Sequence, residues 1–410
     1  MAITSRKIIN DPVHGFITIN DPVIAAIVSH PYYQRLRRIQ QMALAQLVYP
    51  GAVHTRLHHS LGAYHLMCNA ITELKDKGIN ITDAEAQAAK AAILLHDIGH
   101  GPFSHALENV ILKGVTHEDL SLLIMQALNT ENDEALKGKL TLAIQIFTNQ
   151  YPKKFLHQLI SGQLDVDRLD YLSRDSFFTG VSEGVIGYQR ILKMLTVHDN
   201  ELVVEEKGIT SVEKFLVSRR LMYWQVYMHK TVTAADQLLI SILKRARDIA
   251  SSGKALGSYH PLVHFLGVDI DETNFDDEAV ATYTLLDDSD ILNAVKSWTR
   301  SEDRILSTLC KHLLNRELPK IKISTEPVSD RALEEEKIKA MNRFGLRNIE
   351  EASYFIHSGE LANNAYKDDK EGILILRKNG DIVDAAKASD NYNLGALTQT
   401  VTKYFTTYWK

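Results

Sequence analysis

The segment Leu94-Leu95-His96-Asp97-Ile98-Gly99-His100-Gly101-Pro102-Phe103-Ser104-His105 carries the strongest signal in this chain. An Ala-rich run with strong helix propensity precedes it, so the pair His96-Asp97 is expected at a helix C-terminus. A neutral imidazole beside a carboxylate supplies half of a mixed nitrogen and oxygen metal site. Eight of the chain's 17 histidines lie between His54 and His117, and packing alone does not explain that clustering. The segment therefore predicts both a helical core and a functional site.

The sequence around this segment has a helical pattern from about residue 21 to 250. Thr82 and Glu85 have the spacing of a capping box, which begins a helix. Gly99 suits the end of that helix, and Pro102 suits the first turn of the next one. Two further helical stretches are expected, over about 152–175 and 211–250.

The two ends of the chain have a different pattern. Residues 1–20 alternate and contain turn residues, which predicts a short hairpin. Segments 320–323 and 372–377 look like strands, and Asn379-Gly380 is a hairpin turn signal. We therefore expect a mainly α protein. Its helical core should cover 1–250 and include the short N-terminal hairpin, and a smaller helical and α+β region with an oligomerisation or regulatory role should cover 251–410.

The composition is that of an ordinary globular protein, with 410 residues, 45% apolar residues and a net charge of -5. The charge argues against wrapping of nucleic acid. Cys68 and Cys310 match no cysteine-based zinc pattern, which favours a reduced, cytoplasmic protein. We expect no signal peptide and no membrane span, because no apolar run is long enough.

Four residues form the candidate metal site: His59, His96, Asp97 and Asp167. Two imidazoles and two carboxylates suit Mn, Fe, Ni, Zn or Mg, with room for water and phosphate oxygens. The negative end of a helix dipole would favour a cation beside His96-Asp97. Alone, a His-Asp pair at a helix end is usually a surface hydrogen bond, and only the ordered set argues otherwise. His58, next to His59, leaves the register open and is expected to be an outer or surface residue.

Taken together, these motifs resemble the HD-domain metal-dependent phosphohydrolases, and within them the deoxynucleoside triphosphate (dNTP) triphosphohydrolases. That group includes an animal enzyme with an added sterile-alpha-motif domain. The resemblance covers roughly residues 5–250 and weakens beyond. It rests on the segments 10–15, 34–37, 50–52, 56–62, 96–105 and 165–171.

The resemblance implies an HD-domain helical core with His59, His96, Asp97 and Asp167 as metal ligands. It also implies hydrolysis of a dNTP at the α-phosphorus, which yields a deoxynucleoside and inorganic triphosphate. His100, His105 and His117 would line the phosphates, and histidine suits this because its pKa lies near neutrality. His105 would be the general acid, oriented by Glu108, where the family usually has Asp.

The resemblance also implies a nucleotide-binding set. Arg56, Arg168 and Arg219 would clamp phosphates, although a lone Arg is more often a solvated surface charge. Arg168 replaces a Lys of the animal enzyme. The deoxyribose would lie against a wall on which a 2′-hydroxyl finds no room. This wall and the positions near the base would comprise Tyr171, Asp175, Tyr227, Gln41 and Met42.

Several family members are activated by nucleotides bound between subunits, which implies a homodimer or homotetramer. Ser29 stands where the animal enzyme has an Asp that reads guanine, so guanine-specific activation is not expected. An ordinary surface role is the alternative for the whole regulatory set: Lys7, Asn10, Gln34, Arg37, Lys230, Arg316 and Lys320.

Other functions fit the same residues. HD phosphohydrolases also cleave nucleoside monophosphates, cyclic nucleotides and guanosine polyphosphates. A non-catalytic nucleotide sensor could keep the fold, but all four candidate ligands and His105 are present. Single-stranded nucleic acid is not an expected partner, because no basic stripe with interleaved aromatics occurs.

Overall fold

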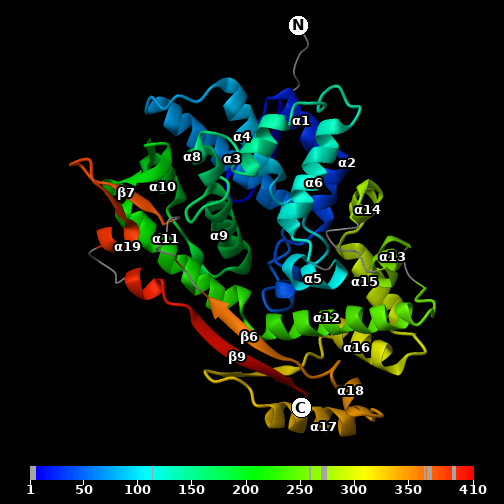
Figure 1. Ribbon diagram of the computed structural model, residues 1–410. Coiled ribbons are helices and arrows are strands. Elements are labelled where there is room, and N and C mark those ends of the chain that lie inside the picture. Colours follow the sequence, from blue (N-terminus) through cyan, green and yellow to red (C-terminus); the bar gives the residue numbers. More distant parts are fainter. Residues whose placement is uncertain are drawn as a thin grey trace.

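The computed structural model describes residues 6–112, 114–257, 260–268, 275–363, 366, 372–389 and 394–410. The description does not extend to the side chains of His105, Glu108, Asn109, His260 and Ala396. Helices dominate the described part (Figure 1). They are α1 (Pro22–Ser29), α2 (Pro31–Gln34), α3 (Arg56–Asp76), α4 (Asp83–Leu95), α5 (Glu108–Ile111), α6 (His117–Thr130), α7 (Thr141–Phe147), α8 (Lys154–Gln158), α9 (Val166–Thr179), α10 (Tyr188–Met194), α11 (Ile209–Met222), α12 (Lys230–Ser251), α13 (His260–Gly267), α14 (Asp277–Tyr283), α15 (Asp288–Trp298), α16 (Arg304–Leu314), α17 (Asp330–Phe344), α18 (Ile349–Ala352) and α19 (Ala385–Ala388).

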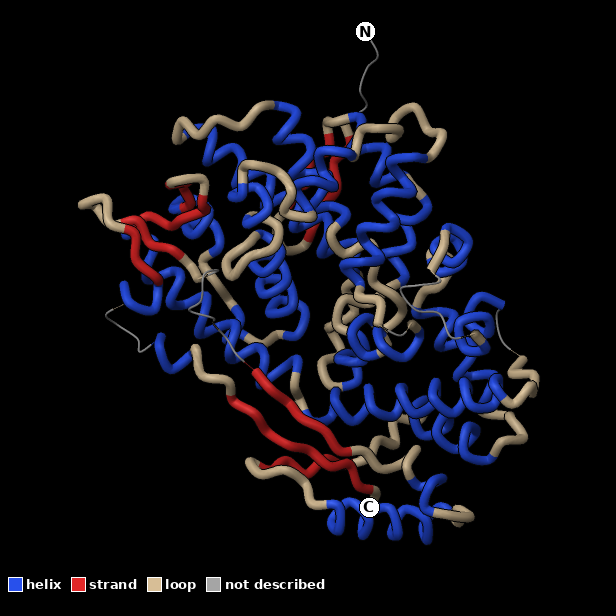
Figure 2. The backbone as a smooth tube through the Cα atoms, viewed as in Figure 1, coloured by secondary structure: helices blue, strands red, loops and turns tan. Residues whose placement is uncertain are grey.

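The strands form three small sheets, and the two larger ones lie at the edge of the helical body (Figure 2). Their orders are β1-β2, β3-β4-β7-β8 and β5-β9-β6. All neighbouring strands are antiparallel except β4 and β7. The strands are β1 (Lys7–Asp11), β2 (Gly15–Ile19), β3 (Leu195–His198), β4 (Glu201–Glu205), β5 (Lys320–Ser324), β6 (Ser358–Asn363), β7 (Leu374–Leu376), β8 (Ile382–Asp384) and β9 (Val401–Tyr408).

The expected fold class is confirmed: a mainly α protein with a helical core and a smaller C-terminal region that contains sheets. The predicted N-terminal hairpin is β1-β2. The predicted Asn379-Gly380 turn joins β7 to β8, and Gly380 has a φ of 91°, which favours glycine. The capping box is also present, because Thr82 and Glu85 each accept a hydrogen bond from the other's backbone N–H.

Three local expectations were wrong. The stretch 152–175 is two helices, because Asp165 accepts a hydrogen bond from the backbone of Arg168 and begins α9 afresh. The stretch 211–250 is interrupted by a π turn over Tyr223–Tyr227. Pro102 does not begin a helix, because Phe103 and Ser104 after it have left-handed φ values of 52° and 46°.

Two hydrophobic cores support the molecule. The larger one is built mainly by α3, α4 and the elements around them, and it also takes in Ile373 and Ile375 near the C-terminus. The second lies around the long helix α12, against which α13 and α16 pack (Figure 1). Among the described residues, no helix is both long and apolar enough to span a membrane.

Candidate metal centre and nucleotide cavity

The four candidate ligands converge at the N-termini of α3 and α9 and the C-terminus of α4. Nε2 of His59 lies 3.0 Å from Oδ1 of Asp167 and 3.4 Å from Nε2 of His96. Asp97 approaches both imidazoles, at 3.6 Å from His59 and 3.4 Å from His96. Asp167 Oδ1 lies 3.5 Å from His96 Nε2. The structure thus brings together the four predicted residues, which lie up to 108 positions apart in the sequence (167 − 59).

Local helix chemistry decides which histidine of the pair His58-His59 faces the centre. His58 accepts a hydrogen bond from the backbone N–H of Thr55 at 3.1 Å and so completes the capping box of α3. The next residue, His59, is therefore turned inward, and it is 1% exposed. This resolves the ambiguity between the two in favour of His59.

The second ring nitrogen of each central imidazole is fixed. His59 Nδ1 lies 2.8 Å from Asp170 Oδ2, and His96 Nδ1 lies 2.6 Å from the carbonyl oxygen of Ile93. Because both acceptors call for a proton on Nδ1, Nε2 of each ring faces the centre and is the nitrogen that would bind a metal there. This is the arrangement that metal-binding histidines need.

Asp170 is the buried support of this arrangement. It accepts from His14 Nε2 at 2.6 Å and from Nε and Nη2 of Arg174, each at 2.9 Å. Burial alone would raise the pKa of Asp170, but the Arg174 guanidinium and the two imidazoles hold it well below its usual range. Arg174 also bonds Asp11. Sequence reasoning gave Asp170, His14 and Arg174 no role, although all three lie in or beside the quoted motifs.

The centre favours positive charge. Burial alone would lower the pKa of His59, but the carboxylates of Asp167 and Asp170 raise it to about 10. Burial would raise the pKa of Asp167, yet His59 and His96 hold it well below its usual range. Two imidazole nitrogens and two ionised carboxylates facing one point form a donor set that fits a divalent cation.

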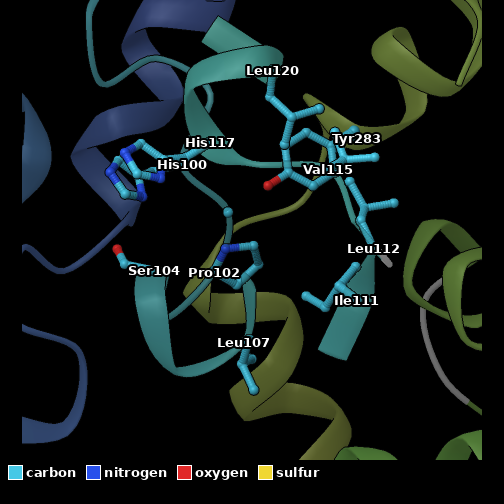
Figure 3. Close-up of a pocket in the computed structure, with 11 residues that line it drawn as sticks. His100, Pro102, Ser104, Leu107, Ile111, Leu112, Val115, His117, Leu120 and Tyr283 are labelled. Atoms are coloured by element: carbon cyan, nitrogen blue, oxygen red, sulfur yellow. The ribbon is translucent and has the colours of Figure 1, made fainter. Parts of the chain in front are cut away.

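Arg56 and two further histidines flank the centre. Arg56 donates to Asp97 Oδ2 through Nη1 and to Ser104 Oγ through Nε at 2.7 Å. His100 Nε2 lies 3.3 Å from Asp97 Oδ1, and its ring stacks on that of His117 with centroids 3.9 Å apart. Figure 3 shows these two rings together, apart from the apolar side chains of Leu107, Ile111 and Leu112. Burial and the nearby Arg56 hold the pKa of His100 well below its usual range.

A cavity of about 330 Å³ opens onto this centre. One wall carries Tyr171 and Tyr227, whose rings meet edge to face at 6.2 Å. Tyr227 donates its hydroxyl to Asp175 Oδ2 at 2.7 Å, and His54 Nε2 lies 2.7 Å from Asp175 Oδ1. His54 was another residue that sequence reasoning missed. The predicted residues that line this cavity are Gln41, Met42, Arg56, Asp97, His100, His117, Asp167, Tyr171, Asp175 and Tyr227.

Arg168 and Arg219 line a second cavity of about 340 Å³, and Nη1 of Arg168 lies 3.9 Å from Oδ2 of Asp167 at the centre. Arg168 donates to Asp165 Oδ2 at 2.8 Å. Nε of Arg168 and both Nε and Nη1 of Arg219 are buried without a hydrogen-bond partner in the described part of the chain. The described lining of this cavity contains two arginines and no carboxylate, so it suits an anion.

Four of the seven predicted regulatory residues have hydrogen-bond partners within the chain. Lys7 donates to Ser29 Oγ at 2.8 Å, and Arg37 donates to Gln34 Oε1 at 2.7 Å. Arg316 donates to the carbonyl oxygen of Leu47 at 2.8 Å. The other three lie in β1, at the first position of α12 and at the first position of β5: Asn10, Lys230 and Lys320. The side chains of His105 and Glu108 lie outside the described part, so their predicted roles stay predictions.

Comparisons with known proteins identify the family. The HD-domain profile matches residues 56–175, and the HD-associated region matches residues 186–255. A crystal structure of a phosphohydrolase from Bacteroides thetaiotaomicron is 50% identical, with a TM-score of 0.94 over 99% of this chain and 100% of that one. The uncharacterised protein YwfO of Bacillus subtilis is 32% identical over 94% of this chain and 88% of its own length. The chain therefore belongs to the HD-domain family, which is a metal-dependent phosphohydrolase superfamily.

Within that superfamily the expected resemblance to dNTP triphosphohydrolases is confirmed. The deoxynucleoside triphosphate triphosphohydrolase SAMHD1 homolog of Dictyostelium discoideum is 32% identical over 59% of this chain. The human protein, deoxynucleoside triphosphate triphosphohydrolase SAMHD1, is 28% identical over 60% of this chain. The chain spans 50% and 45% of the lengths of these two relatives.

Proposed function

We propose that this protein hydrolyses deoxynucleoside triphosphates at the α-phosphorus and releases a deoxynucleoside and inorganic triphosphate. The observation that carries the proposal is the joint placement of two sets of residues around one cavity. His59, His96, Asp97 and Asp167 converge at one point, and two of them, Asp97 and Asp167, line this cavity together with Tyr171, Asp175 and Tyr227. The first set suits a metal and a phosphate, and the second suits a sugar.

The metal would be held by His59, His96, Asp97 and Asp167. When bound, a divalent metal would polarise a phosphoryl oxygen and lower the pKa of a water molecule. Asp170 and the Ile93 carbonyl would keep both imidazoles oriented for this task. The identity of the metal is left open among Mn, Fe, Ni, Zn and Mg.

The phosphates would meet positive charge that is already in place. Arg56 is held by Asp97 and Ser104, so its guanidinium needs little rearrangement when an anion arrives. His100 and His117 present their stacked rings to the same end of the cavity. Arg168 and Arg219 would bind the far end of the triphosphate, which the anion-suited lining of their cavity supports. His105 as general acid and Glu108 as its orienting partner rest on the resemblance alone.

The sugar would lie against Tyr171 and Tyr227. Asp175 is fixed by hydrogen bonds from both His54 and Tyr227, so it offers a preorganised acceptor for a sugar hydroxyl. The resemblance to the family implies that the Tyr171 ring leaves no room for a 2′-hydroxyl, which favours deoxynucleotides. Activation by a second nucleotide, and assembly into a homodimer or homotetramer, are proposed from the resemblance.

A product assay tests the proposal. The protein is incubated with each dNTP and each NTP, with Mn or Mg, singly and in mixtures, and free triphosphate is measured. We expect triphosphate from dNTPs and little from NTPs. Absence of triphosphate in every mixture would refute the proposal, and orthophosphate from nucleoside monophosphates would assign a nucleotidase instead.

Substitution of a proposed ligand tests the metal site directly. Asp167→Ala should remove bound metal and reduce turnover by at least about 10³-fold, because metal-assisted charge stabilisation is lost. The fold should persist, since the Asp167 side chain is 21% exposed and lies in the first turn of α9. Metal content, circular dichroism and triphosphate release are measured, with Glu334→Ala on the exposed face of α17 as control. Full metal occupancy in Asp167→Ala would contradict the ligand assignment.

A further inference from the structure

Part of the cavity lining comes from α12, from the π turn and from the segment after Gln40. Met42, Ala43, Val226 and Val232 make this part largely apolar. Asp236 lies one helical turn after Val232 on α12 and lines the same cavity. We call these five residues the α12 wall. An ionisable group on an otherwise apolar wall needs an explanation.

Asp236 has a buried acceptor that the protein leaves unused. Its Oδ1 is buried and accepts no hydrogen bond from the described residues. Oε1 of Gln41, which lines the same cavity, is also buried without a partner in the described part of the chain. Burial raises the pKa of Asp236 to about 7. Buried polar atoms are nearly always paired, so two unused acceptors in one cavity indicate N–H donors on a ligand.

The position of the α12 wall identifies the part of the ligand it faces. This step rests on the proposed function. Phosphates would occupy the end with Arg56, Asp97 and Asp167, and the sugar would occupy the wall of Tyr171 and Asp175. The α12 wall belongs to neither of these two parts of the lining, and an apolar surface with a few polar groups suits a nucleobase.

We propose that Asp236 selects the base by binding the two adjacent N–H donors of guanine. Guanine presents N1–H and N2–H side by side, and these match the two oxygens of a carboxylate. Adenine and cytosine present one amino group beside an acceptor nitrogen, and thymine presents one N–H between two carbonyl oxygens. Those acceptor atoms would face the carboxylate unfavourably. Asp236 is therefore a specificity-determining residue, and dGTP is the preferred substrate.

The test compares dGTP with dTTP in the full-length protein at pH 8, where the Asp236 carboxyl is ionised. The wild-type protein should show a kcat/KM at least about 10-fold higher for dGTP, the factor expected for a hydrogen bond to a charged group. Asp236→Asn, which keeps the shape but replaces one acceptor by a donor, should lower this ratio by about 10-fold or more. The ratio is independent of the active fraction of each preparation. Gln237→Ala, next on the same helix but outside the cavity lining, should leave the ratio unchanged.

Equal kcat/KM for dGTP and dTTP in the wild-type protein would overturn the proposal, whether or not the variant folds. An unchanged ratio in Asp236→Asn would overturn it too. If the wild-type protein hydrolyses no dNTP, the proposed function fails, and equilibrium dialysis of dGTP and dTTP then tests base recognition by itself. Selective retention of dGTP that is lost in Asp236→Asn would support the role of Asp236, and equal retention of both would refute it.

Discussion

At the scale of single residues, the centre depends on groups that do not face it. Asp170 orients His59 and is itself fixed by His14 and Arg174. The four central residues were predictable, because an imidazole and a carboxylate in motif order indicate a metal. Asp170 was not, because an aspartate three residues after Asp167 gives no sequence signal of which imidazole it will meet. His54 was missed for the same reason, since its partner Asp175 is 121 residues away.

Replacement of Asp170 tests this support. Asp170→Asn should weaken metal binding by about 10- to 100-fold, because an amide can offer only one acceptor oxygen where His14, His59 and Arg174 all donate. Titration calorimetry with Mn gives the affinity, and a thermal melt reports the fold. Asp236→Asn removes a carboxylate from the same cavity without touching His59 and should bind Mn as the wild-type protein does. Equal affinities in the two variants would contradict the role of Asp170.

At the scale of elements, the site exists because α3 and α9 approach closely. Gly62 makes this possible: a Cβ there would lie 2.0 Å from Asp170 Oδ1 and 2.2 Å from Arg174 Nη2. The glycine therefore lets the buried ion pair lie against α3. Helix α4 was predictable from its cap and its alanine run. The start of α9 at Asp165 and the π turn were not predictable from the sequence, because a helical periodicity continues through both. Side-chain caps and tertiary packing decide where the helices break.

Gly62→Ala is expected to disturb the site through this contact. In an open helix the change would stabilise, but here Asp170 or α3 must move, at a cost of about 1–3 kcal/mol in the free energy of unfolding. Metal affinity should fall with it, because Asp170 holds His59. Urea unfolding and Mn titration measure the two effects. Gly187→Ala is the matched control, since nothing lies within 4 Å of a Cβ there; equal behaviour of the two variants would refute the contact argument.

At the scale of the whole molecule, two sets of contacts cross the domain boundary that was expected near residue 250. Strand β7 pairs with β4, so residues 374–376 and 203–205 lie side by side in one sheet. Helix α12, whose last residue is Ser251, buries one face against α13 and α16. Sequence patterns predicted a helical core before residue 250 and a helical and α+β region after it. They could not reveal these pairings, because contacts between distant segments leave no local periodicity. The division at 250 stays a prediction about independent folding.

Truncation after residue 250 puts this division to the test. The fragment would expose the apolar face of α12, including Leu238, Leu239, Ile242 and Leu243, each of which is at most 2% exposed in the intact chain. Exposing each side chain should lower the free energy of unfolding by about 2 kcal/mol. The sum over the four side chains approaches the whole stability of a typical domain. We therefore expect fragment 1–250 to aggregate or to melt without a cooperative transition, and to bind Mn weakly. Replacing the four residues by Gln or Lys within the fragment should restore solubility if the exposed face is the cause. A soluble, cooperatively melting 1–250 that binds Mn like the full chain would instead establish an independent HD-domain core.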